Sequence, residues 1–316
     1  MSLAEKTAVL LIGFGGPQNV SEIRPFLESV LEGASIPAQR FDAIVHRYEG
    51  LNGVSPYNAL TELQKKALER WLSSQNASMP VGVGFRHSKP AFRDVFETFK
   101  KYQVRKVIGF VLASFRSHAS FEKYQMKLSE AQHQAGAESI QIIYTDFFYD
   151  HPLYLEAQSE RVLEVLKSFS EEEKQATYFL FSAHSIPLAM CEKSCATNSK
   201  CCYGSQFYKA SASIAKKLGL GKRWSIAYQS RSGQPTDLWL EPDVKEVIQK
   251  LDSKKFKHVF SIPLGFLCDN VEVIYDLDVE LKQCCEESNF QYFRASTVSD
   301  HPKFIEMMGR QILEKM

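Results

Sequence analysis

This sequence of 316 residues contains few cysteines, and its positive and negative charges nearly cancel. Lysine and arginine number 38 against 37 acidic residues, so the net charge of +1 offers no field that would attract nucleic acid or an anionic membrane. Seven cysteines, an odd number, are too few for a disulfide scaffold. Because 44% of the residues are hydrophobic and 24% are charged, the chain is not a disordered one either. These absences predict an ordinary globular protein with no nucleic-acid partner.

Long apolar runs are also missing. The longest, Ala8–Phe14 and Val107–Ala113, are well short of the roughly 18 residues that a membrane span needs. Lys6 precedes an apolar stretch as in a secretory signal, but the turn Gly15-Gly16-Pro17 follows in place of a cleavage site. We therefore expect a cytoplasmic protein with reduced cysteines and at most peripheral membrane contact. The sequence does not determine the oligomeric state.

The motifs of phosphate binding and serine hydrolysis are absent as well. A dinucleotide fingerprint that begins at Gly13 and Gly15 would need a third glycine where Gln18 stands. The chain contains neither Gly-Lys-Ser/Thr nor Gly-x-Ser-x-Gly. Nucleotide-dependent and serine-hydrolase functions are therefore disfavoured.

What the chain does contain is an alternation of short apolar runs with amphipathic stretches. The helical stretches include Ala59–Trp71, Phe92–Tyr102 and Leu153–Phe169. This alternation predicts an α/β fold with parallel sheets covered on both faces. The predicted strands are Thr7–Gly13, Val81–Phe85, Lys106–Leu112, Ser139–Thr145, Thr177–Ser182, Trp224–Tyr228, His258–Pro263 and Phe290–Ala295.

One segment of the sequence recurs 150 residues later. Asp150–Glu156 (DHPLYLE) is repeated as Asp300–Glu306 (DHPKFIE), and each copy follows a fourth predicted strand. We expect each copy to open a helix, with the aspartate as its N-cap and the proline in its first turn. The repeat predicts a duplicated chain of two similar lobes that meet near residue 150, with a ligand cleft beyond the carboxyl ends of the strands.

Two groups of polar residues follow buried strands. His184 comes at the end of the predicted strand that begins at Thr177. Glu272, Asp276 and Glu280 recur every four residues, so a helix would stack them along one face. Such a ladder is often a solvated surface stripe, but the apolar residues before it predict a buried start, where carboxylates need cations or shared protons. An imidazole and carboxylates in one cleft would suit divalent metal handling coupled to proton transfer.

The segments that contain these residues resemble the ferrochelatase family, whose members insert ferrous iron into a porphyrin to make haem. The most specific matching segments are Ser182–Pro187 (SAHSIP) and Asp269–Glu280. Other matches are the Gly-Gly-Pro turn, Gly53–Pro56, Gly84–Arg86 with Pro90, Gln229–Gly233 and Trp239–Pro242.

The resemblance implies a class II chelatase fold of two Rossmann-like lobes, residues 1–150 and 151–300, with a porphyrin cleft between them. A final helix in residues 301–316 would pack back on the first lobe. The implied activity is insertion of Fe²⁺ into protoporphyrin IX. His184 and Glu272 would be the catalytic pair, with His184 accepting pyrrole protons because imidazole titrates near neutral pH. The implied metal-handling residues are His184, Glu272, Asp276 and Glu280, and the implied porphyrin contacts are Phe14, Ser55, Arg86 and Trp239.

The sequence departs from the family pattern at three places. Asn270 stands where the family usually carries histidine, which weakens any role for a second imidazole. The segment Phe26–Gly53 is short and not strongly apolar, and within it Arg40 and Arg47 are only candidates for binding propionates. The third departure is a cysteine-rich insertion over residues 188–205.

That insertion holds four of the seven cysteines: Cys191, Cys195, Cys201 and Cys202. Their spacing is not that of a zinc ribbon, and disulfides are disfavoured in a reducing cytoplasm. Four thiolates suffice for a [2Fe–2S] cluster, two for each iron, and some ferrochelatases carry such a cluster. We expect this cluster as a structural or sensory cofactor; a structural Zn²⁺ or no metal at all are the alternatives.

Two other functions fit the same residues. Histidine and carboxylate ligands do not by themselves select Fe²⁺ over Co²⁺, so a cobalt chelatase of the same fold is one alternative. A non-catalytic carrier of tetrapyrroles or metals, or a redox sensor built on an inactive chelatase, is the other. The intact pair of His184 and Glu272 argues against the inactive forms.

Overall fold

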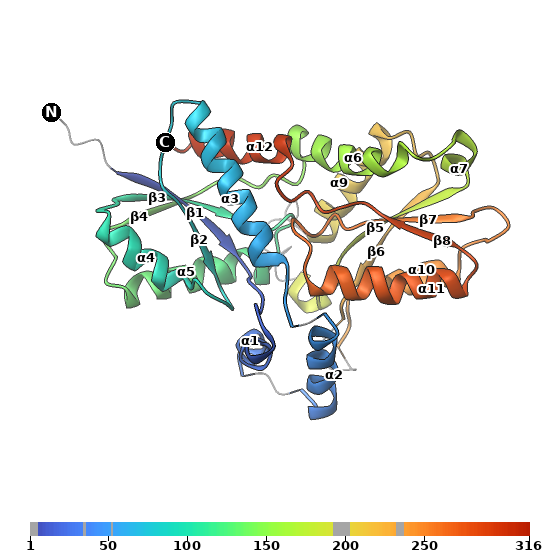
Figure 1. The fold of residues 1–316 in the computed structure, drawn as a ribbon, viewed down its shortest axis with the longest axis horizontal. Coiled ribbons are helices and arrows are strands. Elements are labelled where there is room, and N and C mark those ends of the chain that lie inside the picture. The colour runs from blue at the N-terminus through green and yellow to red at the C-terminus, as the bar shows by residue number, and fades with distance from the viewer. Residues whose placement is uncertain (1–5, 34–35, 52, 192–202, 232–236) are drawn as a thin grey trace. The chain divides into compact units, whose positions relative to one another are not determined.

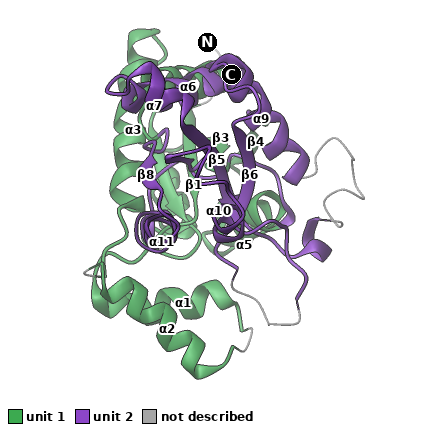
Figure 2. Ribbon diagram, turned by 90° about the vertical axis from the view of Figure 1, so that its right-hand side faces the viewer, with its two compact units in different colours: residues 1–113, 119–147, 299–316 green, residues 114–118, 148–298 purple. Residues whose placement is uncertain are grey.

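The computed structural model describes residues 6–33, 36–51, 53–191, 203–231 and 237–316 (Figure 1). The chain divides into two compact units, shown in separate colours in Figure 2. Unit 1 comprises residues 1–113, 119–147 and 299–316, and unit 2 comprises residues 114–118 and 148–298. Each unit is built on one four-stranded parallel sheet.

The sheet of unit 1 has the strand order β2-β1-β3-β4. Strand β1, one of the two inner strands, is almost wholly buried, as expected for a parallel sheet covered on both faces. All neighbouring strands run parallel, so their carboxyl ends lie at one edge. The strands are β1 (Thr7–Gly13), β2 (Val81–Phe85), β3 (Lys106–Val111) and β4 (Gln141–Tyr144).

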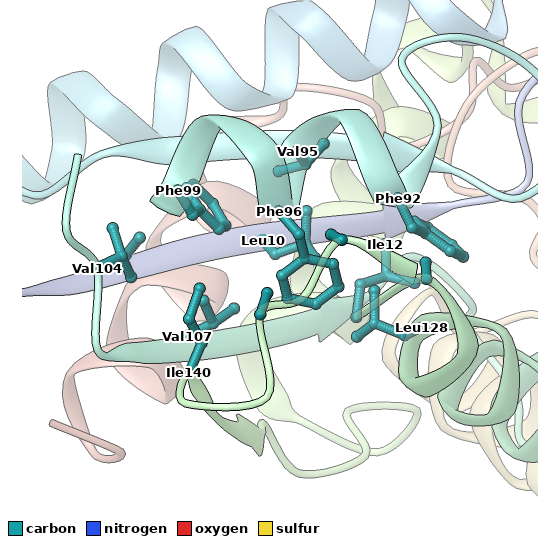
Figure 3. Close-up of a cluster of buried hydrophobic side chains, with 14 of the residues drawn as sticks. Leu10, Ile12, Phe92, Val95, Phe96, Phe99, Val104, Val107, Leu128 and Ile140 are labelled. Carbon is teal, nitrogen blue, oxygen red and sulfur yellow. The ribbon is translucent and has the colours of Figure 1, made fainter. Parts of the chain in front are cut away.

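Two pairs of helices cover the faces of this sheet. Helices α4 (Phe92–Lys101) and α5 (Lys123–Gln134) bury one apolar cluster, which Figure 3 shows around Phe96 between α4 and the strands. Helices α3 (Tyr57–Ser74) and α12 (Pro302–Leu313) lie side by side, and Phe304 of α12 packs edge-on against Phe110 of β3. The C-terminal helix is therefore an integral part of unit 1.

Two further helices of unit 1 have a small core of their own. A short 3-10 turn (Val20–Glu22) leads into α1 (Ile23–Leu31), and α2 (Ala38–Glu49) follows. Figure 1 draws both helices apart from those that cover the sheet. Their shared apolar cluster consists of Ile23, Phe26, Leu27 and Val45, with Phe14 packed against it.

Unit 2 repeats the sheet topology of unit 1, with the strand order β6-β5-β7-β8. Its strands are β5 (Thr177–His184), β6 (Trp224–Gln229), β7 (His258–Ile262) and β8 (Gln291–Arg294). Its described α-helices include α6 (Pro152–Leu166), α7 (Glu171–Gln175), α9 (Tyr203–Lys217), α10 (Val244–Gln249) and α11 (Lys282–Glu287). The predicted α/β class with two Rossmann-like parallel sheets is therefore confirmed, and each of the eight predicted strands is present to within two residues at either end.

The predicted capping residue of the repeated segment is wrong. Helix α6 is capped by His151, whose Nδ1 accepts a hydrogen bond from the Leu153 amide at 3.2 Å. Helix α12 is capped in the same way by His301, at 3.3 Å from the Lys303 amide. The aspartate lies one residue too early, because proline occupies the first helical position and the cap is the residue directly before it.

The helix that carries the acidic ladder also differs from expectation. Residues Val273–Leu281 form a nine-residue π-helix, labelled η4, that continues directly into α11. A π-helix is wider than an α-helix and usually lasts a single turn, often at a functional site. Glu272, at the N-cap, begins this segment. No helix among the described residues is both long enough and apolar enough to cross a membrane.

Candidate active site

His184 is the last residue of β5, at the carboxyl edge of the sheet of unit 2. It lies opposite Gln229 of β6 in the strand register, and the Tyr203 hydroxyl donates a hydrogen bond to its main-chain carbonyl at 2.9 Å. The imidazole Nδ1 donates to the carbonyl oxygen of Ser185. A main-chain carbonyl can only accept, so Nδ1 carries a proton and Nε2 is the nitrogen left for chemistry.

The partner of that nitrogen is Glu272. His184 Nε2 lies 3.5 Å from Glu272 Oε1, and the two side chains are 31% and 40% exposed. Gln229 donates its side-chain amide to the main-chain carbonyl of Glu272 at 3.2 Å, which ties the start of η4 to the end of β6. The two predicted catalytic residues are thus brought together, both half-open to solvent.

The charges around His184 favour its protonated form. Burial of the ring disfavours the cation, but the charge and hydrogen bond of Glu272, the Ser185 carbonyl and the charge of Asp276 outweigh it and raise the pKa of His184 to about 9. At neutral pH the site of the unliganded protein therefore holds an imidazolium–carboxylate pair.

The other two carboxylates of the ladder have different partners. Asp276 is buried and accepts a hydrogen bond from the Ser230 hydroxyl. Glu280 forms an ion pair with Lys245, whose Nζ lies 2.8 Å from Glu280 Oε2. Burial disfavours the Lys245 cation, but the Glu280 carboxylate reverses this and raises the pKa of Lys245. Along η4, Glu272 therefore faces an imidazole, Asp276 a hydroxyl and Glu280 an ammonium group.

The four predicted metal-handling residues do not form a closed metal site. Within the described ranges, no group of three or more histidine, cysteine, aspartate or glutamate residues is placed to hold a metal ion. Among the four, His184 and Glu272 form an ion pair. An imidazole and a carboxylate side by side can contact a cation and can exchange protons.

Three predicted porphyrin contacts lie in unit 1. Phe14 follows β1, and its ring packs against those of Phe26 and His87 at centroid distances of 6.1 and 4.6 Å. Ser55 is buried, and its amide donates to the Pro17 carbonyl at 2.9 Å. Both residues stand beyond the carboxyl end of β1, as the sequence predicts for a binding edge.

Arg86, the third of these residues, is held by a carboxylate of the chain. Its side chain is only 6% exposed and forms an ion pair with Glu32, just after α1. Lys123 binds the other oxygen of Glu32 at 2.8 Å. Burial alone would raise the pKa of Glu32, but these two cations lower it to about 2. Two basic side chains thus converge on one carboxylate.

Trp239, the fourth predicted contact, lies in unit 2 and pairs by its backbone with Pro187, a few residues after His184. Hydrogen bonds from Leu188 to Leu238 and from Leu240 to Ile186 complete this short antiparallel bridge. Arg40 and Arg47, the candidate propionate-binding residues, are both partly exposed on α2 of unit 1.

Of the four predicted iron–sulfur ligands, only Cys191 belongs to the described residues. It is buried, and its amide donates to the Pro187 carbonyl at 3.1 Å. Cys195, Cys201 and Cys202 lie outside the described residues. The remaining cysteines, Cys268, Cys284 and Cys285, are buried in unit 2.

Sequence reasoning missed the residues that hold the pair in place. Gln229 and Ser230 are both at the end of β6, which neighbours β5, so the rule that ligands gather at the carboxyl ends of strands would have found them. Tyr203 carried no such signal, because its hydroxyl reaches a main-chain atom 19 residues away. Asn270, at the position where histidine was expected, uses its side-chain oxygen to accept from the Val273 amide at 2.8 Å and so supports the start of η4.

Known proteins match nearly the whole chain. The family model described as Ferrochelatase matches residues 6–316. A protein named ferrochelatase from Rhodopirellula baltica is 30% identical over 308 residues, which are 97% of this chain and 85% of that protein. A coproporphyrin III ferrochelatase from Mycobacterium tuberculosis is 32% identical over 309 residues, or 98% and 86% of the two chains.

The solved structure of SirB from Bacillus subtilis with Fe³⁺ superposes with a TM-score of 0.58 at 12% identity, covering 98% of this chain and 95% of that one. A second SirB structure, described as a sirohydrochlorin chelatase in complex with cobalt, has a TM-score of 0.56 at 12% identity and covers 98% and 94% of the two chains. At this identity the superposition establishes a shared chelatase fold.

Proposed function

The chain belongs to the ferrochelatase family, and from this premise we propose that it inserts ferrous iron into a porphyrin through His184 and Glu272. The enzyme class is that of a metal-chelating lyase. The observation that carries the proposal is the placement of an imidazole nitrogen 3.5 Å from a carboxylate at the carboxyl edge of a parallel sheet. Insertion exchanges two pyrrole N–H protons for one Fe²⁺, so a site for it needs a cation-tolerant carboxylate and a proton carrier together.

The proposed macrocycle is coproporphyrin III, in place of the protoporphyrin IX expected from sequence. Several relatives at 30–32% identity, among them those from Mycobacterium tuberculosis and Corynebacterium glutamicum, are named coproporphyrin III ferrochelatases. The Rhodopirellula baltica relative carries no substrate in its name, so protoporphyrin IX is the second candidate. The two porphyrins differ in their number of carboxylates, four against two, which makes them separable in a direct competition.

The raised pKa of His184 constrains how the pair can act. An imidazolium cannot accept a pyrrole proton, so His184 must first release its own proton, and the Glu272 carboxylate beside it is the nearest acceptor. We assign the pair a joint role: Glu272 takes the proton that His184 releases and passes it to solvent, and His184 Nε2 then accepts the two pyrrole protons one after the other, returning to its neutral form between them, as Fe²⁺ enters the macrocycle. Asp276 and Glu280 would continue the path along η4, for metal moving inward or for protons moving outward.

The remaining predicted contacts would hold the macrocycle. We assign Phe14 to an apolar contact with the porphyrin face, and Ser55 and Arg86 to polar contacts in unit 1. Trp239 would supply an aromatic contact from unit 2. The cytoplasm, where reduced iron and free thiols persist, is the proposed location.

An anaerobic insertion assay tests this function. Purified enzyme is offered Fe²⁺, Co²⁺ or Zn²⁺ with coproporphyrin III or protoporphyrin IX, and metalloporphyrin formation is followed by absorbance. We expect Fe²⁺ insertion, with kcat/KM higher for coproporphyrin III. Preference for Co²⁺ with every porphyrin would favour the cobalt chelatase, and failure with all metals would favour a non-catalytic carrier.

A [2Fe–2S] cluster held by Cys191, Cys195, Cys201 and Cys202 is a separate proposal. It is supported by the gathering of four of the seven cysteines in twelve residues, and Cys191, the one member among the described residues, is buried seven residues after His184 in the chain. No step of the insertion passes through the cluster. Protein purified without oxygen should be reddish-brown, with iron and acid-labile sulfide in near-equal amounts; a colourless, zinc-loaded preparation would contradict it.

A further inference from the structure

We propose that Arg294 is a positioning residue for Glu272. It binds one carboxylate before the π-helix and another within it, and so fixes the stretch of main chain that presents Glu272 to His184. The inference rests on the proposed function of that pair and adds to it the device that sets the distance between them. Sequence reasoning assigned no role to Arg294, Asp269 or Asp278.

The guanidinium of Arg294 uses all five of its N–H donors. Nε and Nη2 donate to the two oxygens of Asp278 at 2.7 and 2.8 Å. Nη1 and Nη2 donate to the two oxygens of Asp269 at 3.2 Å each, and Nη1 also donates to the Ala295 carbonyl at 3.2 Å. Two bidentate carboxylates on one guanidinium form a rigid planar arrangement that a lysine could not reproduce.

The two carboxylates bracket Glu272 in the chain. Asp269 lies three residues before it and Asp278 six residues after it, within η4. A nine-residue π-helix is far longer than the single turn in which this geometry usually occurs, so contacts from outside the helix must help to maintain it. Arg294 supplies such contacts on both sides of Glu272.

Arg294 is itself fixed to the sheet that carries His184. It is the last residue of β8 and lies opposite Ser261 of β7, and β7 pairs with β5. Figure 1 shows β8 beside β7 in this sheet. The sheet therefore locates His184 directly through β5 and locates Glu272 through Arg294. Because both routes begin on one sheet, the distance from Nε2 to Oε1 is preset before a substrate arrives.

Partial burial makes this arrangement sensitive to mutation. The Arg294 side chain is 14% exposed, and Asp269 and Asp278 are 26% and 33% exposed. Burial opposes the Arg294 cation, but the two carboxylates more than compensate and raise its pKa. Removing the guanidinium would leave two carboxylates facing each other, and their repulsion would push the segment before η4 away from the helix.

A purely structural arginine in the same unit provides the matched control. Arg223 donates to the main-chain carbonyls of Lys174 and Thr177, near the amino end of β5. It is partly buried like Arg294 but supports the opposite edge of the sheet. Arg223→Gln should therefore lower stability without changing the chemistry at His184.

The test compares Arg294→Gln with Arg294→Lys, Asp278→Asn and Arg223→Gln in the full-length enzyme. We expect Arg294→Gln to lower kcat by roughly 10- to 100-fold, the size of effect that a misplaced group of about 1 Å produces, with a much smaller change in the KM for porphyrin. Arg294→Lys should recover part of this loss, and Asp278→Asn should reproduce much of it. If kcat for Arg294→Gln fell no more than for Arg223→Gln, Arg294 would be structural only.

A second measurement is independent of turnover. Calorimetric titration with Zn²⁺ alone is carried out on the wild type, Arg294→Gln, Glu272→Gln and the double variant. We expect Arg294→Gln to weaken Zn²⁺ binding when Glu272 is present and to have no further effect when it is absent. Equal weakening in both backgrounds, or no Zn²⁺ binding by the wild type, would contradict the inference. A wild-type enzyme that binds Zn²⁺ in this pattern but inserts no metal would refute the proposed function alone.

Discussion

His184 Nε2 and Glu272 Oε1 face each other at 3.5 Å, although the two residues are 88 positions apart in the chain. One side chain ends a strand and the other begins a π-helix. The separation is long for a hydrogen bond, so charge attraction is the larger part of the interaction and the hydrogen bond is weak.

The first prediction concerns the ionisation of His184. The titration of its imidazole, followed by NMR, should have a midpoint near pH 9 in the wild type, because Glu272 stabilises the cation. In Glu272→Gln the midpoint should fall markedly, since burial then becomes the main influence. A midpoint near 6.5 in both proteins would contradict the electrostatic account.

Stability should follow the same ionisation. Because folding raises the pKa of His184, the stabilisation from its pair with Glu272 is fully present below about pH 6.5 and is lost as the pH rises through about 9. The partial exposure of both side chains limits the effect to about 1 kcal/mol. Urea unfolding should therefore show a difference between wild type and Glu272→Gln at pH 6 that disappears by pH 10.

A second stability prediction concerns the ion pairs at the end of α1. Glu32→Gln should lower the free energy of unfolding by about 1–2 kcal/mol, since Arg86 would lose its counter-charge in a buried setting. The pKa of Glu32 is lowered to about 2, so its contribution is present above about pH 4.5 and is lost only as the pH falls toward 2. Glu138→Gln, which removes an exposed pair with His133, is the control and should change little.

Close packing between α3 and α12 gives a further prediction about stability. A Cβ added at Gly309 would lie 2.1 Å from the indole Cε3 of Trp71, which is closer than any packed contact. Gly309→Ala should cost about 1–3 kcal/mol or more of stability, measured by thermal unfolding. The double variant Gly309→Ala with Trp71→Leu should recover part of that loss. If Gly309→Ala were neutral, the two helices would not pack as described.

Substitutions of the carboxylates along η4 should differ in their effect on insertion. Glu272→Ala should nearly abolish insertion, whereas Glu280→Ala should reduce kcat only mildly, because Lys245 already neutralises Glu280 at the far end of the ladder. Asp276→Ala should fall between them. Steady-state rates at saturating Fe²⁺ would decide this order. A larger loss in Glu280→Ala than in Glu272→Ala would exchange the inner and outer roles.

The strands, and the position of His184 at the end of one of them, could be predicted from sequence because their signals are local, whereas the pairing of His184 with Glu272 was implied by the family resemblance. Apolar runs such as Thr7–Gly13 mark buried parallel strands whatever the rest of the chain does. His184 and Glu272 stand at strand ends and helix starts, where an α/β fold places its chemistry.

The features that sequence reasoning missed depend on side-chain contacts between distant residues. Arg294 binds Asp278, which lies 16 positions earlier in the chain, and no pattern in the intervening sequence predicts this pairing. The π-helix was missed because acidic residues four apart suit an α-helix equally well. The caps of α6 and α12 were misassigned because histidine is not among the usual capping residues.

The most direct test of the central claim is single-turnover insertion of Fe²⁺ into coproporphyrin III under anaerobic conditions by the wild type, His184→Ala and His133→Ala. His133 is an exposed histidine of α5 and serves as the matched control. We expect rapid insertion by the wild type and by His133→Ala, and loss of at least about 100-fold in rate for a folded His184→Ala, as expected when a proton carrier is removed. Insertion by His184→Ala at close to the wild-type rate would contradict the claim that His184 and Glu272 carry the reaction.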